Sequence, residues 1–379
     1  MKKILLFIYF LIIFATPVFG TQETVLNSQI NSLNIPSFIE ESKKYTKQAF
    51  PDLNLNEFLT QAITGNIDNS GIFKKMLNLL GAEFKGTLKI IAGILIIIIV
   101  HSILNSFSSN LERSNMAQIS FYVQYILIVT LVMTNFADIL KLVNDSIQNL
   151  VGFIYSLFPI LITLMISTGS VVSGTVIQPI ILLLMQFIGN IISTFIIPII
   201  LVGTVLGIIS NISDKVQISK LSKYLKSGMI WLVGIILTIF VTVLSLEGTM
   251  TASVDGITAK TTKAAVSTVI PVVGKILGDA VDTVIGCAGI LKNAVGIFGI
   301  IVIIGICITP IIKLTLYTCT YYIICAIAEP IANKKIISLL ETFGDTFKIL
   351  LGLLTAISFM VIIGVTIVIK ISNSGLMYR

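Results

Sequence analysis

One stretch of this chain reads SIQNLVGFIYSLFPILITLMISTGSVVSGTVIQPIILLLMQFIGNIISTFIIPIILVGTVLGIISNIS, from Ser146 to Ser213, and contains no Asp, Glu, Lys, Arg or His. About 20 apolar residues cross the hydrocarbon core of a bilayer, and a charge at its centre costs several kcal/mol. At 68 residues the stretch is too long for two spans and too short for five. We therefore expect three spans, at 151–168, 176–193 and 194–211, with the two ends of the stretch on opposite sides of the membrane.

The chain as a whole is also strongly apolar. Of its 379 residues, 55% are hydrophobic and 11% are charged, whereas about a quarter of the residues of a soluble protein carry charge. These values indicate an integral membrane protein of the all-α class, and we expect about 8–9 spans. Further candidate spans lie at 88–107, 118–137, 229–246, 293–312 and 349–369.

The N-terminus is typical of a secretory signal peptide. Residues 1–20, MKKILLFIYFLIIFATPVFG, combine two lysines, an apolar run and a small residue at the end, which predicts cleavage between Gly20 and Thr21. The alternative is an uncleaved anchor, because the apolar run is nearly long enough to span. In either case the next segment, 21–87, emerges outside the cytoplasm, and its helix signals include Asn54 with Glu57 at N-cap and N3 spacing.

The lysine distribution gives an orientation. The loop at 211–228 carries four lysines and one acidic residue, Asp214, which places it in the cytoplasm by the positive-inside rule. Five crossings from an external N-terminus lead to the same side. We expect a first membrane region of six spans at 88–246, an extracytoplasmic or re-entrant segment at 247–292, and a C-terminal membrane region at 293–379.

The last membrane region has two possible topologies. As one straight helix, residues 293–328 would be about 54 Å long, so we expect a break near Pro310 and Lys313. Two crossings there give nine spans and a cytoplasmic C-terminus, which is the favoured count. A single crossing gives eight, with Lys334 and Lys335 in the cytoplasm and the C-terminal tail outside.

The segment at 247–292 is unusually polar for its position between spans. Asp255 and Gly256 predict a turn, and from 269 to 284 apolar residues recur at helical spacing opposite a polar face. The segment fits a re-entrant helical hairpin, an interfacial helix or a face that docks another protein, and periodicity alone does not choose among them. Its candidate interface residues are Asp255, Lys260, Lys263, Pro271, Gly274, Lys275, Gly278, Asp279 and Asp282.

The chain contains no recognisable catalytic or cofactor-binding motif. Its single histidine, His101, falls in the first expected span, and Lys313 falls in a later one, so both are candidates for a transport pathway. The four cysteines form no CxxC pair, and we expect neither a disulfide framework nor a metal site. The net charge of +7 is assigned to lysines that flank the membrane, and not to nucleic-acid binding.

The polar segment closely resembles the stage III sporulation protein AE family. The resemblance covers the signal peptide, the short external segment, the many spans and the chain length, and is most specific between the spans. The matching residues there are SLEGT at 245–249, VDGITAKTTKAAV at 254–266, IPVVGK at 270–275, Gly278-Asp279 and VDT at 281–283.

The resemblance implies a multi-pass protein of the mother-cell membrane that surrounds the forespore. It implies a non-enzymatic subunit of a channel or secretion apparatus, required for forespore development and late forespore gene expression. The implied partners are a cytoplasmic secretion-type ATPase and ring-forming proteins between the two membranes. The alternatives are an independent secondary transporter that couples ions through His101 or Lys313, and an assembly scaffold without a pore.

Overall fold

The structure is a computed structural model that describes residues 22–47, 54–65, 70–108, 114–212, 218–269 and 273–377. Within these ranges the chain is helical apart from short turns, and it forms no strand, which confirms the all-α class. The predicted signal peptide at 1–20 and its cleavage site between Gly20 and Thr21 lie outside the described residues and stay predictions.

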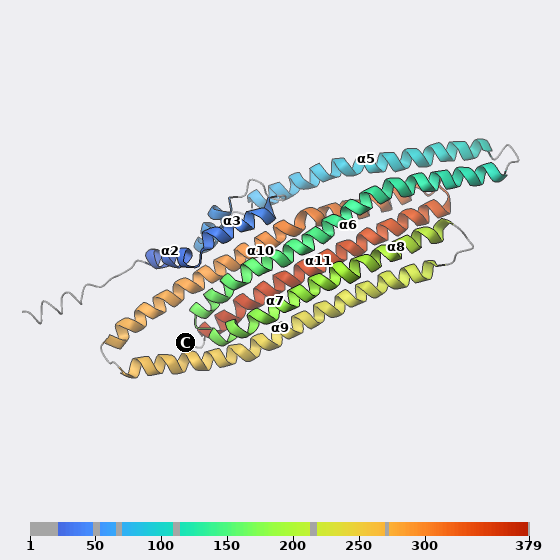
Figure 1. Ribbon diagram of the computed structural model, residues 1–379. Helices are drawn as coiled ribbons and strands as arrows, with labels where there is room; N and C mark the ends of the chain where they lie inside the picture. The colour runs from blue at the N-terminus through green and yellow to red at the C-terminus, as the bar shows by residue number, and fades with distance from the viewer. Residues whose placement is uncertain are drawn as a thin grey trace, which may run out of the picture.

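Short helices precede a bundle of long ones (Figure 1). The short helices are α2 (Gln22–Ser32), α3 (Ile35–Thr46) and α4 (Leu55–Thr64). The long helices are α5 (Ser70–Ser108), α6 (Ser114–Ser167), α7 (Val171–Ile191) continued through the π-helix η1 (Ile192–Ile196) into α8 (Ile197–Ile212), α9 (Ser219–Val269), α10 (Val273–Ala328) and α11 (Lys334–Met377).

The long helices contain more than enough apolar sequence to cross a bilayer. Within the described residues, five segments are long and apolar enough to span: Ile119–Ser167, Val171–Ile212, Ser219–Asp255, Asp282–Ala328 and Lys334–Ile371. The predicted span at 88–107 lies in α5. The structure does not describe the side chains of residue 101 and of residues 104–107 in this span. At 54 residues α6 is about 81 Å long, well beyond the roughly 30 Å hydrocarbon core, so at ordinary tilts part of it lies outside that core.

The structure has fewer and longer helices than the sequence predicted. The expected spans at 118–137 and 151–168 both lie on α6, and those at 176–193 and 194–211 share one continuous rod. Pro198 near the start of α8 does not interrupt this rod. A proline ring clashes with the carbonyl four residues earlier in a regular α-helix, and the wider π-helix directly before Pro198 relieves that clash.

The predicted break near Pro310 is also absent, since α10 runs without interruption from Val273 to Ala328. An interior proline costs a helix about 3 kcal/mol. Helix α10 lies in the middle of the bundle, against α5, α6 and α11, and buries many apolar side chains there, Phe298, Val302 and Leu314 among them. Fully burying one such side chain contributes about 1.5–3 kcal/mol, so packing outweighs the local penalty.

The bundle has two chemically different ends (Figure 1). The lysine end, defined by Lys220, Lys223, Lys226, Lys334 and Lys335, is formed by the first turns of α9 and α11. The hairpin end, defined by the end of α9 and the start of α10, lies at the other end of α9. The N-terminal helices α2 and α3 and the C-terminus lie toward the hairpin end.

The N-terminal helices are part of the main core and do not form a separate domain. Phe38 of α3 lies between two aromatic rings, with centroids 6.0 Å from Phe153 on α6 and 5.6 Å from Phe298 on α10. Helix α4 begins as predicted, because the Glu57 backbone N–H donates to Asn54 Oδ1 at 3.4 Å. The segment predicted as helical therefore packs against α6 and α10.

Candidate functional site

Asp255, the second acidic residue of the polar signature, binds the start of α7. The Val172 backbone N–H donates to Asp255 Oδ1 at 2.8 Å, and the Ser173 N–H donates to Oδ2 at 3.0 Å. Ser170, at the N-cap position of α7, makes no side-chain capping bond. A carboxylate from another helix therefore satisfies the first N–H groups of α7 and faces the positive end of its dipole.

This contact fixes the level at which the α9–α10 hairpin leaves the bundle. Asp255 is only 2% exposed, so α9 is held against the start of α7 at this point. Residues 256–269 continue α9 for about 21 Å beyond it, and α10 returns from Val273. Figure 1 shows both helices extending past the turn between α6 and α7. The hairpin tip, defined by residues 256–269 and 273–281, thus projects from the bundle.

Helix α2 also contacts the base of the hairpin. Gln29 Nε2 donates to the backbone oxygen of Val284 at 3.1 Å, and α2, α3 and α4 all pack against α10. The four cysteines, all in described residues, form no disulfide, and Cys287 next to this contact is fully buried. The hairpin base is therefore held from two directions, by α7 through Asp255 and by the N-terminal helices.

The structure corrects one local prediction for the signature. Asp255 and Gly256 do not form a turn, because α9 continues through them to Val269. The backbone is helical from Val273 onward, as the first part of the much longer α10, and the amphipathic character predicted for 269–284 stays a prediction. The hairpin shape agrees with one of the three predicted arrangements, and re-entry into the membrane stays a prediction.

The other predicted interface residues lie in the two helices of the hairpin or between them. Asp282 is exposed on α10. Pro271 lies outside the described residues. The remaining residues have their backbone in one of the two helices and their side chains outside the description: Lys260 and Lys263 in α9, and Gly274, Lys275, Gly278 and Asp279 in α10.

Lys313, a predicted pathway residue, has a counterion. Its Nζ lies 3.3 Å from Glu83 Oε1 on α5, and both side chains are less than a third exposed. This ion pair joins α5 to α10. His101 lies on α5, and its side chain falls outside the description, so its predicted role is untested.

A polar cluster at the lysine end was missed by the sequence analysis. Lys226, assigned there to a cytoplasmic loop, is 6% exposed on α9 and donates to Thr346 Oγ1 at 2.7 Å and to the Thr342 backbone oxygen at 3.3 Å. The Thr204 hydroxyl on α8 lies 2.9 Å from that of Thr346. Helical spacing could have predicted this burial, because Lys226 lies on the same face of α9 as Phe240 and Leu244, which are buried further along the helix.

Two glycines of α8 allow this cluster to form. A Cβ at Gly203 would lie 3.2 Å from Lys226 Cγ, and one at Gly207 would lie 2.8 Å from Thr342 Cγ2. The Ser222 hydroxyl donates to the Gly203 backbone oxygen at 2.6 Å across the same contact. Small residues four apart thus bring α8 close to α9 and α11, as in other membrane helix pairs.

Long apolar antiparallel helices joined by buried polar contacts define this chain as a polytopic helical membrane protein. The chain matches the family model described as Stage III sporulation protein AE over residues 53–372, and it belongs to that family. It is similar to the Stage III sporulation protein AE of Bacillus subtilis (strain 168), with 28% identity over 306 residues, which cover 81% of this chain and 77% of that protein. No solved structure matches the chain.

Proposed function

We propose that this chain is a non-enzymatic membrane subunit of a sporulation channel or secretion apparatus that links mother cell and forespore. In this proposal it resides in the mother-cell membrane around the forespore and is required for forespore development and late forespore gene expression. It acts with a cytoplasmic secretion-type ATPase and with ring-forming proteins, and not with nucleic acid. Membership of a sporulation family supports the biological setting.

The observation that carries the proposal is the anchored hairpin. A hairpin that served only to connect two spans would need few residues beyond the bundle. Here the tip continues for about 21 Å beyond Asp255, carries Lys260, Lys263, Lys275 and Asp279, and is held at its base by α7 and α2. A projecting element that is held at its base in this way is suited to contact a partner protein outside the membrane.

The orientation follows from the two ends of the bundle. The positive-inside rule supports a cytoplasmic lysine end. In this proposal the hairpin tip and the N-terminal helices then face the space between the two membranes. The unbroken α10 favours the single-crossing topology, with Lys334 and Lys335 in the cytoplasm and the C-terminal tail outside.

Cysteine labelling tests this orientation. Native Cys287 is buried, so Gly286→Cys is the better probe, because Gly286 is exposed and an added Cβ meets no atom within 4 Å. In a Cys319→Ser background expressed in non-sporulating cells, where the external face of the membrane is accessible, a membrane-impermeant thiol reagent should label Gly286→Cys without permeabilisation. The matched control, Tyr224→Cys, replaces a side chain that is 81% exposed at the lysine end and should react only after permeabilisation. The opposite pattern would overturn the orientation.

The role of the tip is tested by charge insertion. Val273, Leu277 and Val281 share one face of α10 by spacing, and replacing all three by Asp should abolish association with the ring-forming partners while the protein still inserts. A triple Ala variant at the same positions keeps the helix propensity without adding charge, and serves as the control for helix formation. Normal assembly and sporulation of the Asp variant would exclude the tip as a docking element.

The biological role is tested by an in-frame deletion in the spore-forming host, with engulfment and a late forespore reporter followed by microscopy. Normal engulfment with a small forespore and a silent reporter is the expected result. Healthy spores would refute the channel role. Assembly defects in the deletion strain, together with no conductance of the purified protein, would instead indicate a scaffold without a pore.

A further inference from the structure

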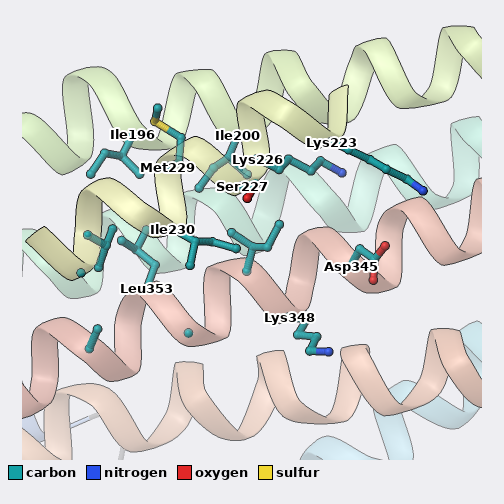
Figure 2. Close-up of a pocket in the computed structure, with 15 residues that line it drawn as sticks. Ile196, Ile200, Lys223, Lys226, Ser227, Met229, Ile230, Asp345, Lys348 and Leu353 are labelled. Carbon is teal, nitrogen blue, oxygen red and sulfur yellow. The ribbon is translucent and has the colours of Figure 1, made fainter. Parts of the chain in front are cut away.

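The bundle contains a large pocket at the lysine end, between α8, α9 and α11. Its volume is about 600 Å³, which is in the range of small-molecule sites. Figure 2 shows that the labelled charged side chains, Lys223, Lys226, Asp345 and Lys348, occupy one part of it. The labelled apolar side chains, including Ile196, Met229 and Leu353, occupy the other part. The pocket is therefore amphipathic.

The polar part has an excess of positive charge. Three lysines and one aspartate line it, and Asp345 is already engaged, because one of its carboxylate oxygens accepts a hydrogen bond from the Tyr322 hydroxyl at 2.7 Å. Lys226 is fixed by Thr346 and Thr342, whereas Lys223 and Lys348 have exposed side chains. Lysine ammonium groups in such an arrangement favour a phosphate or another anion.

The apolar part continues onto the outer surface of α9. Next to the pocket a shallow groove is lined by Ile230, Trp231, Ile235 and Ile239, all of them exposed. From Ser227 to Ile239 the helix rises about 18 Å, similar to the roughly 15 Å depth of one leaflet of the hydrocarbon core. An acyl chain can therefore lie along this groove with its headgroup at the lysines.

We propose that this pocket binds an anionic phospholipid. Its phosphate lies among Lys223, Lys226 and Lys348, and an acyl chain lies along the apolar groove of α9. Charge complementarity selects an anionic headgroup, and the adjoining apolar groove selects a lipid over a free anion. The pocket lies at the lysine end of the bundle, and basic groups between helices at a membrane surface meet anionic headgroups. The inference does not depend on the sporulation role.

The test uses Trp231, which is the only tryptophan of the chain and is 75% exposed in the groove. The full-length protein is reconstituted in phosphatidylcholine vesicles that contain a small fraction of brominated phosphatidylglycerol or, separately, of brominated phosphatidylcholine. Bromine quenches tryptophan fluorescence only at short range. We expect stronger quenching by the brominated phosphatidylglycerol, and equal quenching by the two lipids would overturn the proposal.

Substitution then identifies the groups that bind the headgroup. A lysine near an anionic surface contributes about fivefold in affinity, so Lys223→Gln with Lys348→Gln should reduce the relative affinity for phosphatidylglycerol about 30-fold. Both side chains are exposed, so the variant should fold, and circular dichroism checks this. Lys220→Gln removes one charge from the same end of α9 outside the pocket and should keep most of the preference.

Two outcomes would refute the assignment. A preference retained in the double variant would show that these lysines do not bind the headgroup. Loss of the quenching difference on addition of inorganic phosphate, at constant ionic strength, would show that the site binds a free anion and not a lipid.

Discussion

Replacing Asp255 by alanine tests the anchor of the hairpin directly. The substitution removes both carboxylate oxygens that accept from Val172 and Ser173, at 2.8 and 3.0 Å, and leaves these two N–H groups without their partner at the partly buried start of α7. A hydrogen bond to a charged group contributes about 1.5–3 kcal/mol, and a complete N-cap about 0.5–2 kcal/mol. We therefore expect a loss of about 2–4 kcal/mol.

Hydrogen–deuterium exchange measures this loss at the affected groups. In a peptide that covers the first turn of α7, the two amides should exchange about 30- to 700-fold faster in Asp255→Ala, because each 1.4 kcal/mol corresponds to tenfold. Asp255→Asn keeps one acceptor oxygen and should show about half of the free-energy change. Association of the hairpin tip with partner proteins should weaken in the same order.

The matched control is Glu247→Gln. It removes a negative charge from the same helix, two turns earlier, at a half-buried position. It should leave the exchange of the two α7 amides unchanged. Equal exchange in wild type and Asp255→Ala would refute the proposed cap, and acceleration by Glu247→Gln would show that general electrostatics, and not the two hydrogen bonds, protect the site.

Other substitutions test the packing around the hairpin and the lysine end. Phe38→Ala should destabilise the N-terminal helices by about 3–5 kcal/mol, because a buried ring between two other rings is lost, and proteolysis of α2–α4 would report this. Neutralising either Glu83 or Lys313 should cost about 1 kcal/mol in thermal melts, and the double variant little more than either single one. Thr346→Val should cost about 1.5–3 kcal/mol, since Lys226 stays buried without its hydroxyl partner, and an unchanged melting temperature would contradict this.

The number of spans could not be deduced from apolar length alone. A stretch without charges was divided by the 20-residue thickness rule, but α7, η1 and α8 form one rod of 42 residues. The thickness of the bilayer sets a minimum length for a spanning helix and no maximum, because a helix can extend past the headgroups into a partner or into its own bundle. A proline in an apolar stretch predicts a break in the helix, yet Pro310 lies inside the uninterrupted α10.

The predicted sidedness is nevertheless compatible with the structure. The apolar stretches predict five crossings before the loop at 211–228, whereas the helices make three traverses of the bundle, by α5, by α6 and by α7–α8. Both numbers are odd, so both place the lysine end opposite the N-terminal helices. The predicted side of the lysine end is the same for either number of crossings. It depends on whether that number is odd and on where the lysines lie, and not on where each helix begins.

The sequence by itself determined the class, the family and the position of the polar signature, because these depend on composition, charge and residue order. It also predicted the Asn54 cap, whose partners are three residues apart. Only the tertiary structure showed that Asp255 caps α7, that Lys313 pairs with Glu83, and that Lys226 is buried. Each of these contacts joins residues far apart in the chain, and local periodicity carries no information about which distant helix lies opposite a side chain.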